Sequence, residues 1–154
     1  MGGFGQVCAR FTPDADQTGY QNIIHGGVIS ALMDELLGWP IALQTGRMAV
    51  TGELTVRFRK SMTVGRDYLA TAFPGIDRVK HWEGSGEIRD ARNRVVARAQ
   101  GKYHLLSAEQ TDQVAGELTY RPDDAPVFRF TGRRLGLRHK AERVCAAVET
   151  GLRP

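Results

Sequence analysis

The sequence has little cysteine, which excludes two ways of stabilising a small domain. Cys8 and Cys145 are the only cysteines among 154 residues, and neither belongs to a Cys-x-x-Cys pair. Such a sequence offers neither a disulfide framework nor a cysteine-based zinc site. We expect a protein of the reducing cytoplasm.

A hydrophobic run long enough to cross a membrane is also missing. The longest apolar stretch, residues 28–43, is interrupted by Asp34, Glu35 and Pro40, so we expect no membrane span. The chain does not open with the basic, apolar and small-residue segments of a secretory signal either. Hydrophobic residues make up 42% of the chain and charged residues 25%, which is typical of one globular domain with a core.

Three signatures of cofactor, hydrolase and metal sites are absent or incomplete. Residues 3–5 (Gly-Phe-Gly) lack the third glycine of a dinucleotide-binding loop, and residues 84–86 (Gly-Ser-Gly) are not the Gly-x-Ser-x-Gly turn of α/β-hydrolases. His81, His104 and His139 have no acidic partners at ligand spacing. We therefore expect no metal and no cofactor.

Positive charge is concentrated near the C-terminal end of the sequence. The formal net charge is +4, and residues 125–154 hold seven basic but two acidic residues, which leaves the rest close to neutral. The turn-forming residues 120–126 mark a boundary. We predict a domain over 1–119 and a basic tail over 120–154, partly ordered or a short helix. The tail is either a solvated segment or a contact for an anionic partner, and we expect no nucleic acid partner.

Apolar residues around position 30 predict one buried helix. From residue 26 to residue 37 they cover nearly the whole circumference of a helix with a period of about 3.6: Val28, Ile29, Ala31, Leu32, Met33, Leu36 and Leu37. Such a helix must be buried on most sides. We expect Pro40 to kink or end its regular part and Gly46 to stop it.

After this helix the hydrophobic period changes to two, which predicts strands. Alternation indicates strands at 51–58, 68–73, 79–88 and 95–105, with an earlier strand near 5–11 and a hairpin turn at 90–93. The 95–105 strand has one small-residue face, which permits close packing. This order predicts an α+β fold, in which a curved antiparallel sheet of five to six strands wraps around the central helix. Because the sheet has an unpaired edge, we expect a homo-oligomer.

The residues His25-Gly26-Gly27 open the predicted helix and could bind an anion or an oxyanion. The first N–H groups of a helix have no partners within it. Two glycines let a ligand approach these groups without obstruction by a Cβ. The positive end of the helix dipole adds to this preference for negative charge.

Asp34 lies in the same helix, about 12 Å from its start by the rise per residue. One chain cannot easily bring both groups to one reacting atom, so Asp34 would serve a site completed by a second chain. Glu35 is the competing carboxylate. The alternative is a structural Asp34 whose side chain is satisfied by Ser30 or a backbone group.

These residues carry a resemblance to a known family. Residues 20–38, with His-Gly-Gly followed by Asp-Glu at this spacing, and the Thr-containing strand at 49–60 resemble the hotdog-fold acyl-CoA thioesterases. The similar branch is the phenylacetic-acid-degradation type of the 4-hydroxybenzoyl-CoA thioesterase superfamily, and the resemblance covers about residues 5–106. It implies a hotdog fold, an acyl-CoA substrate, no cofactor and a homodimer or homotetramer.

The resemblance also implies roles for individual residues. In the family, the N–H of the glycine matching Gly26 polarises the thioester carbonyl, and Gly27 beside it is a candidate substrate-binding residue. The acid matching Asp34, supplied by the partner subunit, attacks the carbonyl or activates water. Thr51 falls where a Ser or Thr holds this water, and His25 would orient the loop or the carbonyl.

The sequence departs from the family pattern at one position. Some members have Asn or Gln six residues before the histidine of the motif, where this chain has Gly19. The second oxyanion or water ligand is therefore unassigned. Gln21 and Asn22 are weak substitutes for it.

Cations near the predicted strand ends could hold the phosphates of coenzyme A. We select Arg59, Lys60 and Arg78 as substrate-binding candidates, with a solvated strand surface as the alternative for each. The acyl group is not readable from the sequence. Its pocket could include Trp39, Phe73, Trp82 or Tyr103, although core packing is the more ordinary role for each.

Together these features predict an acyl-CoA thioesterase that releases a free acid and coenzyme A at composite sites on a dimer interface. One alternative is a hotdog module that binds acyl-CoA without cleaving it and has a regulatory role. Another is a hotdog dehydratase, which would form an enoyl product from 3-hydroxyacyl-CoA.

Overall fold

The computed structural model describes residues 5–117. In chain order its elements are β1 (Val7–Phe11), a 3-10 turn (Ala15–Gln17), β2 (Thr18–Tyr20), β3 (Ile23–Ile24), α1 (Gly26–Thr45), β4 (Ala49–Phe58), β5 (Tyr68–Asp77), β6 (Trp82–Asp90), β7 (Val95–Leu105) and α2 (Ala108–Glu117). The basic tail predicted at 120–154 lies outside the described residues. The domain boundary before it stays a prediction.

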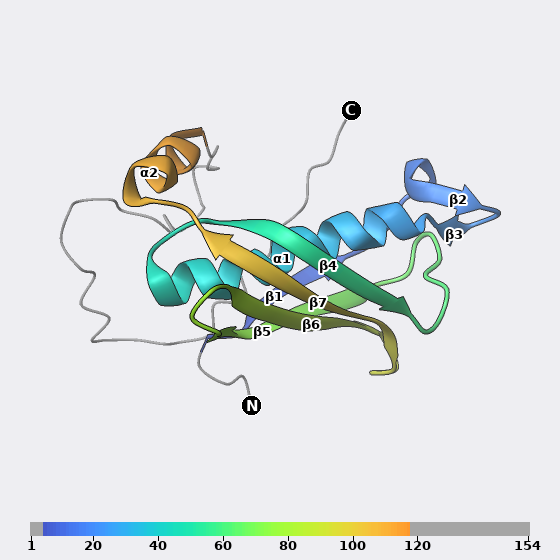
Figure 1. Ribbon diagram of the computed structural model, residues 1–154. Coiled ribbons are helices and arrows are strands. Elements are labelled where there is room, and N and C mark those ends of the chain that lie inside the picture. Colours follow the sequence, from blue (N-terminus) through green and yellow to red (C-terminus); the bar gives the residue numbers. More distant parts are fainter. Residues whose placement is uncertain (1–4, 118–154) are drawn as a thin grey trace.

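Five strands form one antiparallel sheet, in the order β1-β5-β6-β7-β4 (Figure 1). β1 and β4 are therefore the two edges of this sheet. β2 and β3 pair separately in a short hairpin just before α1. The α+β class with an antiparallel sheet is confirmed, whereas the β2–β3 hairpin was not predicted because its strands are too short to show a period.

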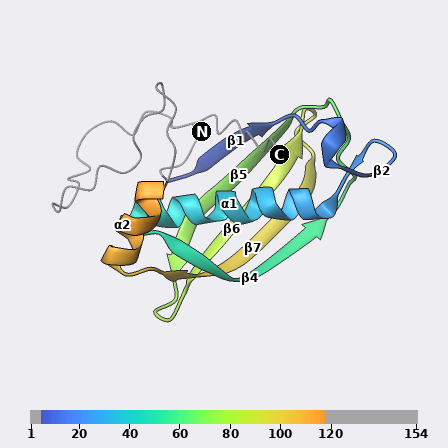
Figure 2. The same ribbon diagram turned by 90° about the horizontal axis from the view of Figure 1, so that it is seen from above.

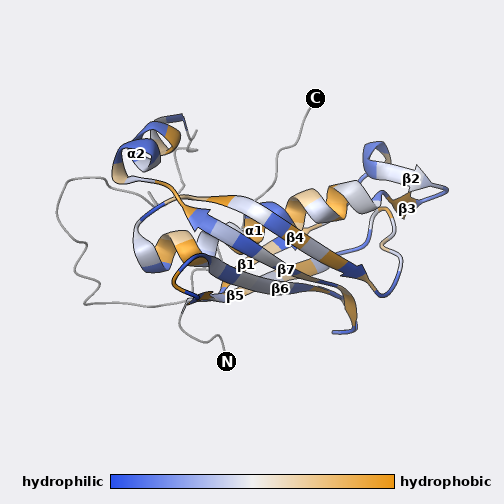
Figure 3. Cartoon of the chain, in the orientation of Figure 1, coloured by the Kyte–Doolittle hydropathy of each residue, from blue (hydrophilic) through white to orange (hydrophobic). Residues whose placement is uncertain are grey.

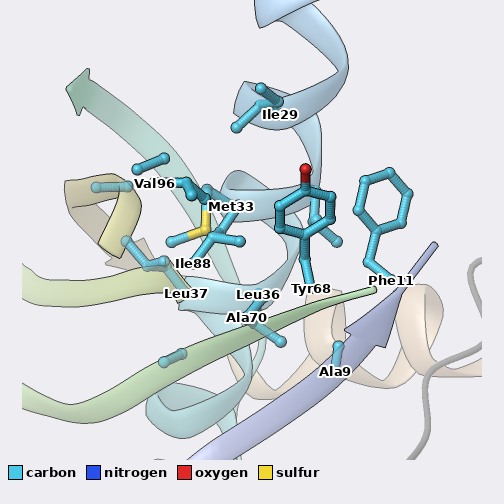
Figure 4. Packing of buried hydrophobic residues seen from close by; sticks show 14 of the residues in the cluster. Ala9, Phe11, Ile29, Met33, Leu36, Leu37, Tyr68, Ala70, Ile88 and Val96 are labelled. Carbon is cyan, nitrogen blue, oxygen red and sulfur yellow. The ribbon is translucent and has the colours of Figure 1, made fainter. Parts of the chain in front are cut away.

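α1 lies across one face of the sheet and contributes the centre of the core (Figure 2). Met33 and Leu37 are fully buried. In Figure 4, side chains of the helix meet Ala70 and Ile88 from the strands. Figure 3 shows the hydrophobic colouring that recurs along α1. Burying this apolar surface is the main force that holds the helix on the sheet.

Small residues in the sheet allow this close approach. A Cβ on Gly86 would lie 3.1 Å from both Leu37 Cδ1 and Met33 Cε. Ala97 and Ala99 of β7 are buried as well. The structure thus confirms that the small-residue face of this strand permits close packing.

The side of α1 that faces away from the sheet is uncovered within residues 5–117. Ala31 and Glu35 are exposed, and Asp34 and Trp39 are half-buried. The predicted burial on most sides is therefore wrong for one protomer, because the sheet covers only one side. By length and composition α1 could also cross a membrane, but its buried residues pack in the core of the sheet.

The ends of α1 follow its capping residues. His25 is the N-cap, and Gly46 ends the helix in the left-handed conformation with φ 67°, its N–H donating to Ala42. Pro40 does not end the helix, which continues to Thr45. The Pro40 ring is fully buried, and its packing offsets the backbone hydrogen bond that proline cannot make.

The hairpin between β5 and β6 differs from the prediction at both strands. β5 continues past Pro74 to Asp77, because an irregularity between Phe73 and Ile76 accommodates a residue without an N–H. β6 begins at Trp82 and not at residue 79. Val79 has φ 71° and belongs to the turn.

The helix α2 was not predicted, since its sequence is polar and weakly periodic. It follows β7 directly (Figure 1), and the segment from Leu106 to α2 bonds to the connection between α1 and β4. The Met48 N–H donates to Thr111 Oγ1 at 3.2 Å, and Arg47 Nε donates to the Leu106 carbonyl at 2.6 Å. These bonds fix the segment that leads from α1 into β4.

Candidate active site

The start of α1 presents a single free amide. His25 Nδ1 accepts the N–H of Gly27 at 2.9 Å, and the His25 carbonyl accepts the N–H of Val28 at 3.0 Å. The N–H of Gly26 has no hydrogen-bond partner within residues 5–117. It is the amide left for a ligand at this end of the helix dipole.

A cleft of about 670 Å³ opens at this amide. His25, Gly26, Arg59 and Lys60 all line it, so the structure brings four predicted site residues together. The remaining lining is mostly apolar: Gly19, Tyr20, Ile23, Ile24, Ile29, Phe58, Ser61 and Met62. We call this the helix-start cleft; it offers cations, apolar surface and one amide donor to the same ligand.

A second cleft of about 390 Å³ surrounds Asp34. Thr51 Oγ1 donates to Asp34 Oδ1 at 2.7 Å. The other residues that line this carboxylate cleft are Glu35, Gly38, Trp39, Ala42, Met48, Ala49, Val50 and Tyr103. Ser30 is not the partner of Asp34, because its hydroxyl donates to the Gly26 carbonyl at 2.9 Å. The half-buried Asp34 thus keeps Oδ2 for another partner.

Glu35 is engaged elsewhere in the same cleft. Trp39 Nε1 donates to Glu35 Oε1 at 3.1 Å, one turn along α1. Glu35 is exposed, and no hydroxyl within the described chain holds it as Thr51 holds Asp34. The two neighbouring carboxylates therefore differ in their partners: Asp34 accepts from a hydroxyl, and Glu35 accepts from an indole N–H.

Tyr103 forms the floor of the carboxylate cleft. Its side chain is 1% exposed, and its hydroxyl donates to the Asp34 backbone carbonyl at 3.4 Å. Burial, together with the nearby Asp34 and Glu35 carboxylates, raises the pKa of Tyr103 well above its usual range. The hydroxyl therefore keeps its proton. The sequence predicts only a core or acyl-pocket role for Tyr103, because its place opposite Thr51 depends on strand register.

The two clefts belong to opposite ends of β4. Ala49, Val50 and Thr51 line the carboxylate cleft, whereas Phe58 lines the helix-start cleft. Among the described residues the clefts share none of their lining. The amide of Gly26 and the carboxylate of one protomer therefore cannot act on the same atom.

Two predicted substrate-binding residues lie apart from the clefts. Arg78 does not line the helix-start cleft, and its Nε donates to Glu83 at 2.9 Å in an exposed ion pair. The amide of Gly27 is occupied by His25. A Cβ on Gly27 would lie 2.8 Å from His25 Nδ1, so glycine is required there by the cap.

Gly19, at the position where some members of the resembling family have Asn or Gln, lies against His25. A Cβ on Gly19 would lie 3.1 Å from His25 Cδ2, so any side chain there would press on the imidazole. Gln21 and Asn22 are exposed and do not line the helix-start cleft. Neither replaces the missing ligand in this protomer.

His81 of the β5–β6 turn and His104 of β7 do not build a metal site in the described part of the chain. His81 lies 3.7 Å from a Glu83 oxygen and its ring centroid is 6.4 Å from that of His104. No group of three His, Cys, Asp or Glu side chains in residues 5–117 could hold a metal ion.

Solved structures with the same fold include several proteins linked to coenzyme A. The chain is 22% identical to smu.793 from Streptococcus mutans, solved with acetyl-CoA; the match covers 67% of this chain and 82% of that one, with a TM-score of 0.61. It is 23% identical to Escherichia coli PaaI, from the phenylacetic acid degradation operon, with coverage of 67% and 74% and a TM-score of 0.61. At these identities the likeness concerns the fold alone.

A third structure is an acyl-CoA hydrolase from Staphylococcus aureus, solved with butyryl-coenzyme A and coenzyme A. It is 20% identical, with coverage of 68% of this chain and 65% of that chain and a TM-score of 0.63. No curated protein matches the chain. The family model of the thioesterase superfamily matches residues 21–97, half of the sequence, which contain the His-Gly-Gly motif and Asp34. This match confirms the hotdog fold, and the chain belongs to the thioesterase superfamily.

Proposed function

We propose that the protein hydrolyses an acyl-CoA thioester to a free acid and coenzyme A, at sites that two protomers build together. One observation carries this proposal. Each protomer presents a free amide, at Gly26, in one cleft and a hydroxyl-held carboxylate, Asp34, in another. In two protomers related by a two-fold axis, the amide of each could meet the carboxylate of the other, which would give two equivalent sites.

The edge strand β4 supports this pairing. It is ten residues long, and the exposed edge would otherwise invite uncontrolled association. If β4 pairs antiparallel with its copy about its own centre, Phe58 of one protomer lies opposite Ala49 of the other. That register brings the helix-start cleft of one protomer to the carboxylate cleft of its partner.

The cations of the helix-start cleft support coenzyme A as the leaving group. Arg59 and Lys60 are exposed beside Gly26 and could pair with the phosphates. The structural relatives solved with acetyl-CoA or butyryl-coenzyme A favour the same class of substrate. The low cysteine content favours the cytoplasm as its location.

The proposed chemistry needs no group beyond these residues. Gly26 N–H donates to the thioester oxygen, which becomes an oxyanion as the carbonyl carbon is attacked. Asp34 of the other protomer takes a proton from water, and the water oxygen bonds to this carbon. The C–S bond then breaks, and the thiolate leaves with the proton that Asp34 returns. Direct attack by Asp34, with later hydrolysis of the anhydride, gives the same products.

Thiol release by purified variants tests this mechanism. Asp34→Asn removes the base but keeps the size of the side chain, so we expect kcat to fall at least about 100-fold. Glu35→Gln keeps an oxygen for Trp39 and should retain most of the activity. An active Asp34→Asn protein, or an equal loss in Glu35→Gln, would contradict the assignment of Asp34.

Gly26→Pro tests the amide donor. His25 has φ −61° and ψ 132°, a conformation that suits the residue before proline, and proline is favoured at the first helical position. The variant removes the N–H and keeps the helical backbone. Its Cβ would lie 3.3 Å from Phe58 Cζ, so the exposed Phe58 ring has to move slightly. We expect kcat to fall about 100- to 1000-fold, while the melting temperature stays close to that of the wild type.

The same assays separate the alternatives. Tight acyl-CoA binding without thiol release by any acyl group would indicate the non-hydrolytic module. An enoyl product from 3-hydroxyacyl-CoA would indicate the dehydratase.

A further inference from the structure

Phe58 is a large apolar residue that one protomer leaves exposed. It is the last residue of the edge strand β4 and is 54% exposed. One part of its ring lies against the helix start, because a Cβ on Gly26 would lie 3.3 Å from Phe58 Cζ and 3.7 Å from both Cε atoms. The ring thus rests on the residue that carries the free amide, while about half of its surface stays open to solvent.

The carboxylate cleft contains an apolar part beside Asp34. This part is lined by Trp39, Ala42, Met48, Ala49 and Val50. Val50 is 50% exposed, although it is β-branched and apolar. Exposed apolar surface of this kind, rimmed by polar groups, is typical of a contact surface.

Gly38 keeps this part of the cleft open. It lies inside α1, one turn after Asp34, where glycine is less stable than alanine. Within the described chain, a Cβ there would meet only Tyr103 Cε1, at the ordinary contact distance of 3.9 Å. The protomer by itself therefore does not need glycine at this position. The room above Gly38 is available to a group from outside the protomer.

The two clefts are complementary in charge. Within residues 5–117, the helix-start cleft is lined by Arg59 and Lys60 and by no acidic residue, whereas the carboxylate cleft is lined by Asp34 and Glu35 and by no basic residue. Opposite charges on two surfaces favour their association and select their orientation. A second copy of this chain therefore offers each cleft its complement.

The pairing of β4 with its copy brings Phe58 to this cleft. In the register proposed above, Phe58 of one protomer lies opposite Ala49 of the other, and directly opposite residues project from the same face of a sheet. Ala49 lines the carboxylate cleft and Phe58 lies against Gly26 of α1, so both side chains are on the helix side of the sheet. In this register the ring of one protomer points into the carboxylate cleft of the other.

We propose that the Phe58 ring of one protomer docks in the apolar part of the carboxylate cleft of a second copy, in the room above Gly38. The ring is then held between that cleft and its own Gly26, which fixes the Gly26 amide beside the Asp34 carboxylate of the other protomer. Phe58 is thus an anchor of the interface and a positioning residue. The inference rests on the proposed function for its catalytic consequence, whereas the docking itself requires no substrate.

Sedimentation velocity of Phe58→Ala tests the docking. Removing an aromatic anchor from an interface should raise the dissociation constant of the dimer at least about 30-fold. Ile76→Ala is the matched control, since Ile76 is a similarly exposed apolar residue, at 51%, on another strand. Its dissociation constant should stay within about twofold of the wild-type value. A monomeric wild-type protein, or a Phe58→Ala dimer as tight as the wild type, would overturn the proposal.

Gly38→Leu, alone and combined with Phe58→Ala, tests where the ring docks. The added side chain fills the room above Gly38, so the single variant should also weaken the dimer. Within one protomer the two positions are far apart, because Phe58 contacts Gly26 and α1 rises about 18 Å from there to Gly38.

Losses from such distant positions multiply unless the two side chains meet across the interface. In the double variant the added side chain takes the place of the missing ring. Its dimer should therefore be at least about tenfold tighter than the product of the two single losses predicts. A fully multiplicative loss would overturn docking above Gly38.

Kinetics at protein concentrations where Phe58→Ala is still dimeric test the positioning role. With the acyl-CoA that the wild-type protein cleaves fastest, kcat should fall at least about tenfold, because the amide is no longer held at the carboxylate. Phe58→Leu, which keeps an apolar side chain, should recover part of this loss. A fully dimeric Phe58→Ala protein with the wild-type kcat would overturn the positioning role.

Absence of thiol release by the wild-type dimer would instead defeat the proposed function. In that case the sedimentation results still decide whether Phe58 docks above Gly38. The two failures are therefore distinguishable.

Discussion

At the scale of single residues, His25 explains most about how the start of α1 is built. Its imidazole caps the helix, where Ser, Thr, Asp or Asn is the usual choice. Since Nδ1 accepts the Gly27 N–H at 2.9 Å, the neutral ring carries its proton on Nε2. A serine would cap the helix as well but would offer no donor at that distance. We propose that the Nε2–H of His25 donates to the ligand of the cleft that this residue lines.

Two variants separate the capping role of His25 Nδ1 from the proposed donor role of Nε2. Asn is a good N-cap, so His25→Asn should lower the free energy of unfolding by a few tenths of a kcal/mol, whereas His25→Ala should lower it by about 1 kcal/mol. Urea denaturation measures both. If thiol release falls in both variants alike, the loss reflects the ring and not the cap. Equal destabilisation of the two variants would show that the capping bond contributes little.

At the scale of elements, the turn between β5 and β6 has a residue that does not suit it. Val79 adopts φ 71°, is 97% exposed, and donates its N–H to Asp77 Oδ1 at 2.7 Å. A β-branched side chain is strained in this left-handed region. The exposed side chain makes no packing contact that would offset the strain. The turn is therefore less stable than the same turn would be with a residue that suits this φ.

Val79→Gly should relieve this strain. Removing the Cβ should raise the free energy of unfolding by up to about 1 kcal/mol, since the greater freedom of glycine in the unfolded chain offsets part of the gain. Chemical denaturation gives the value, and Val79→Ala, which keeps a Cβ, is the control. A destabilised Val79→Gly protein would mean that the valine side chain makes a stabilising contact.

At the scale of the whole molecule, the separation of the two clefts determines what one protomer can do alone. Each protomer contributes the amide of Gly26 to one proposed site and the carboxylate of Asp34 to the other. A protomer that lacks the Gly26 N–H therefore damages one of the two proposed sites, and a protomer that lacks the Asp34 carboxylate damages the other. Under the proposed function, activity is therefore a property of the pair.

Mixing two inactive variants tests this directly. A dimer of one Gly26→Pro protomer and one Asp34→Asn protomer has one site with both defects and one intact site. Random re-pairing of equal amounts should therefore restore about a quarter of wild-type thiol release. Each variant treated alone in the same way is the control. A mixture that stays inactive after proven exchange of protomers would place both groups in one chain.

The sequence by itself determined the local features of this protein. Hydrophobic periods placed α1 and the main strands, His25 and Gly46 set the helix ends, and the spacing of Gly26 and Asp34 separated the two groups, because each of these depends on neighbours along the chain. Only the tertiary structure placed Tyr103 opposite Thr51, brought Thr51 to Asp34 and put Arg78 beside Glu83, apart from the helix-start cleft. These contacts arise from strand order and register, which join residues that are distant in sequence, and periodicity holds no information about which strands pair.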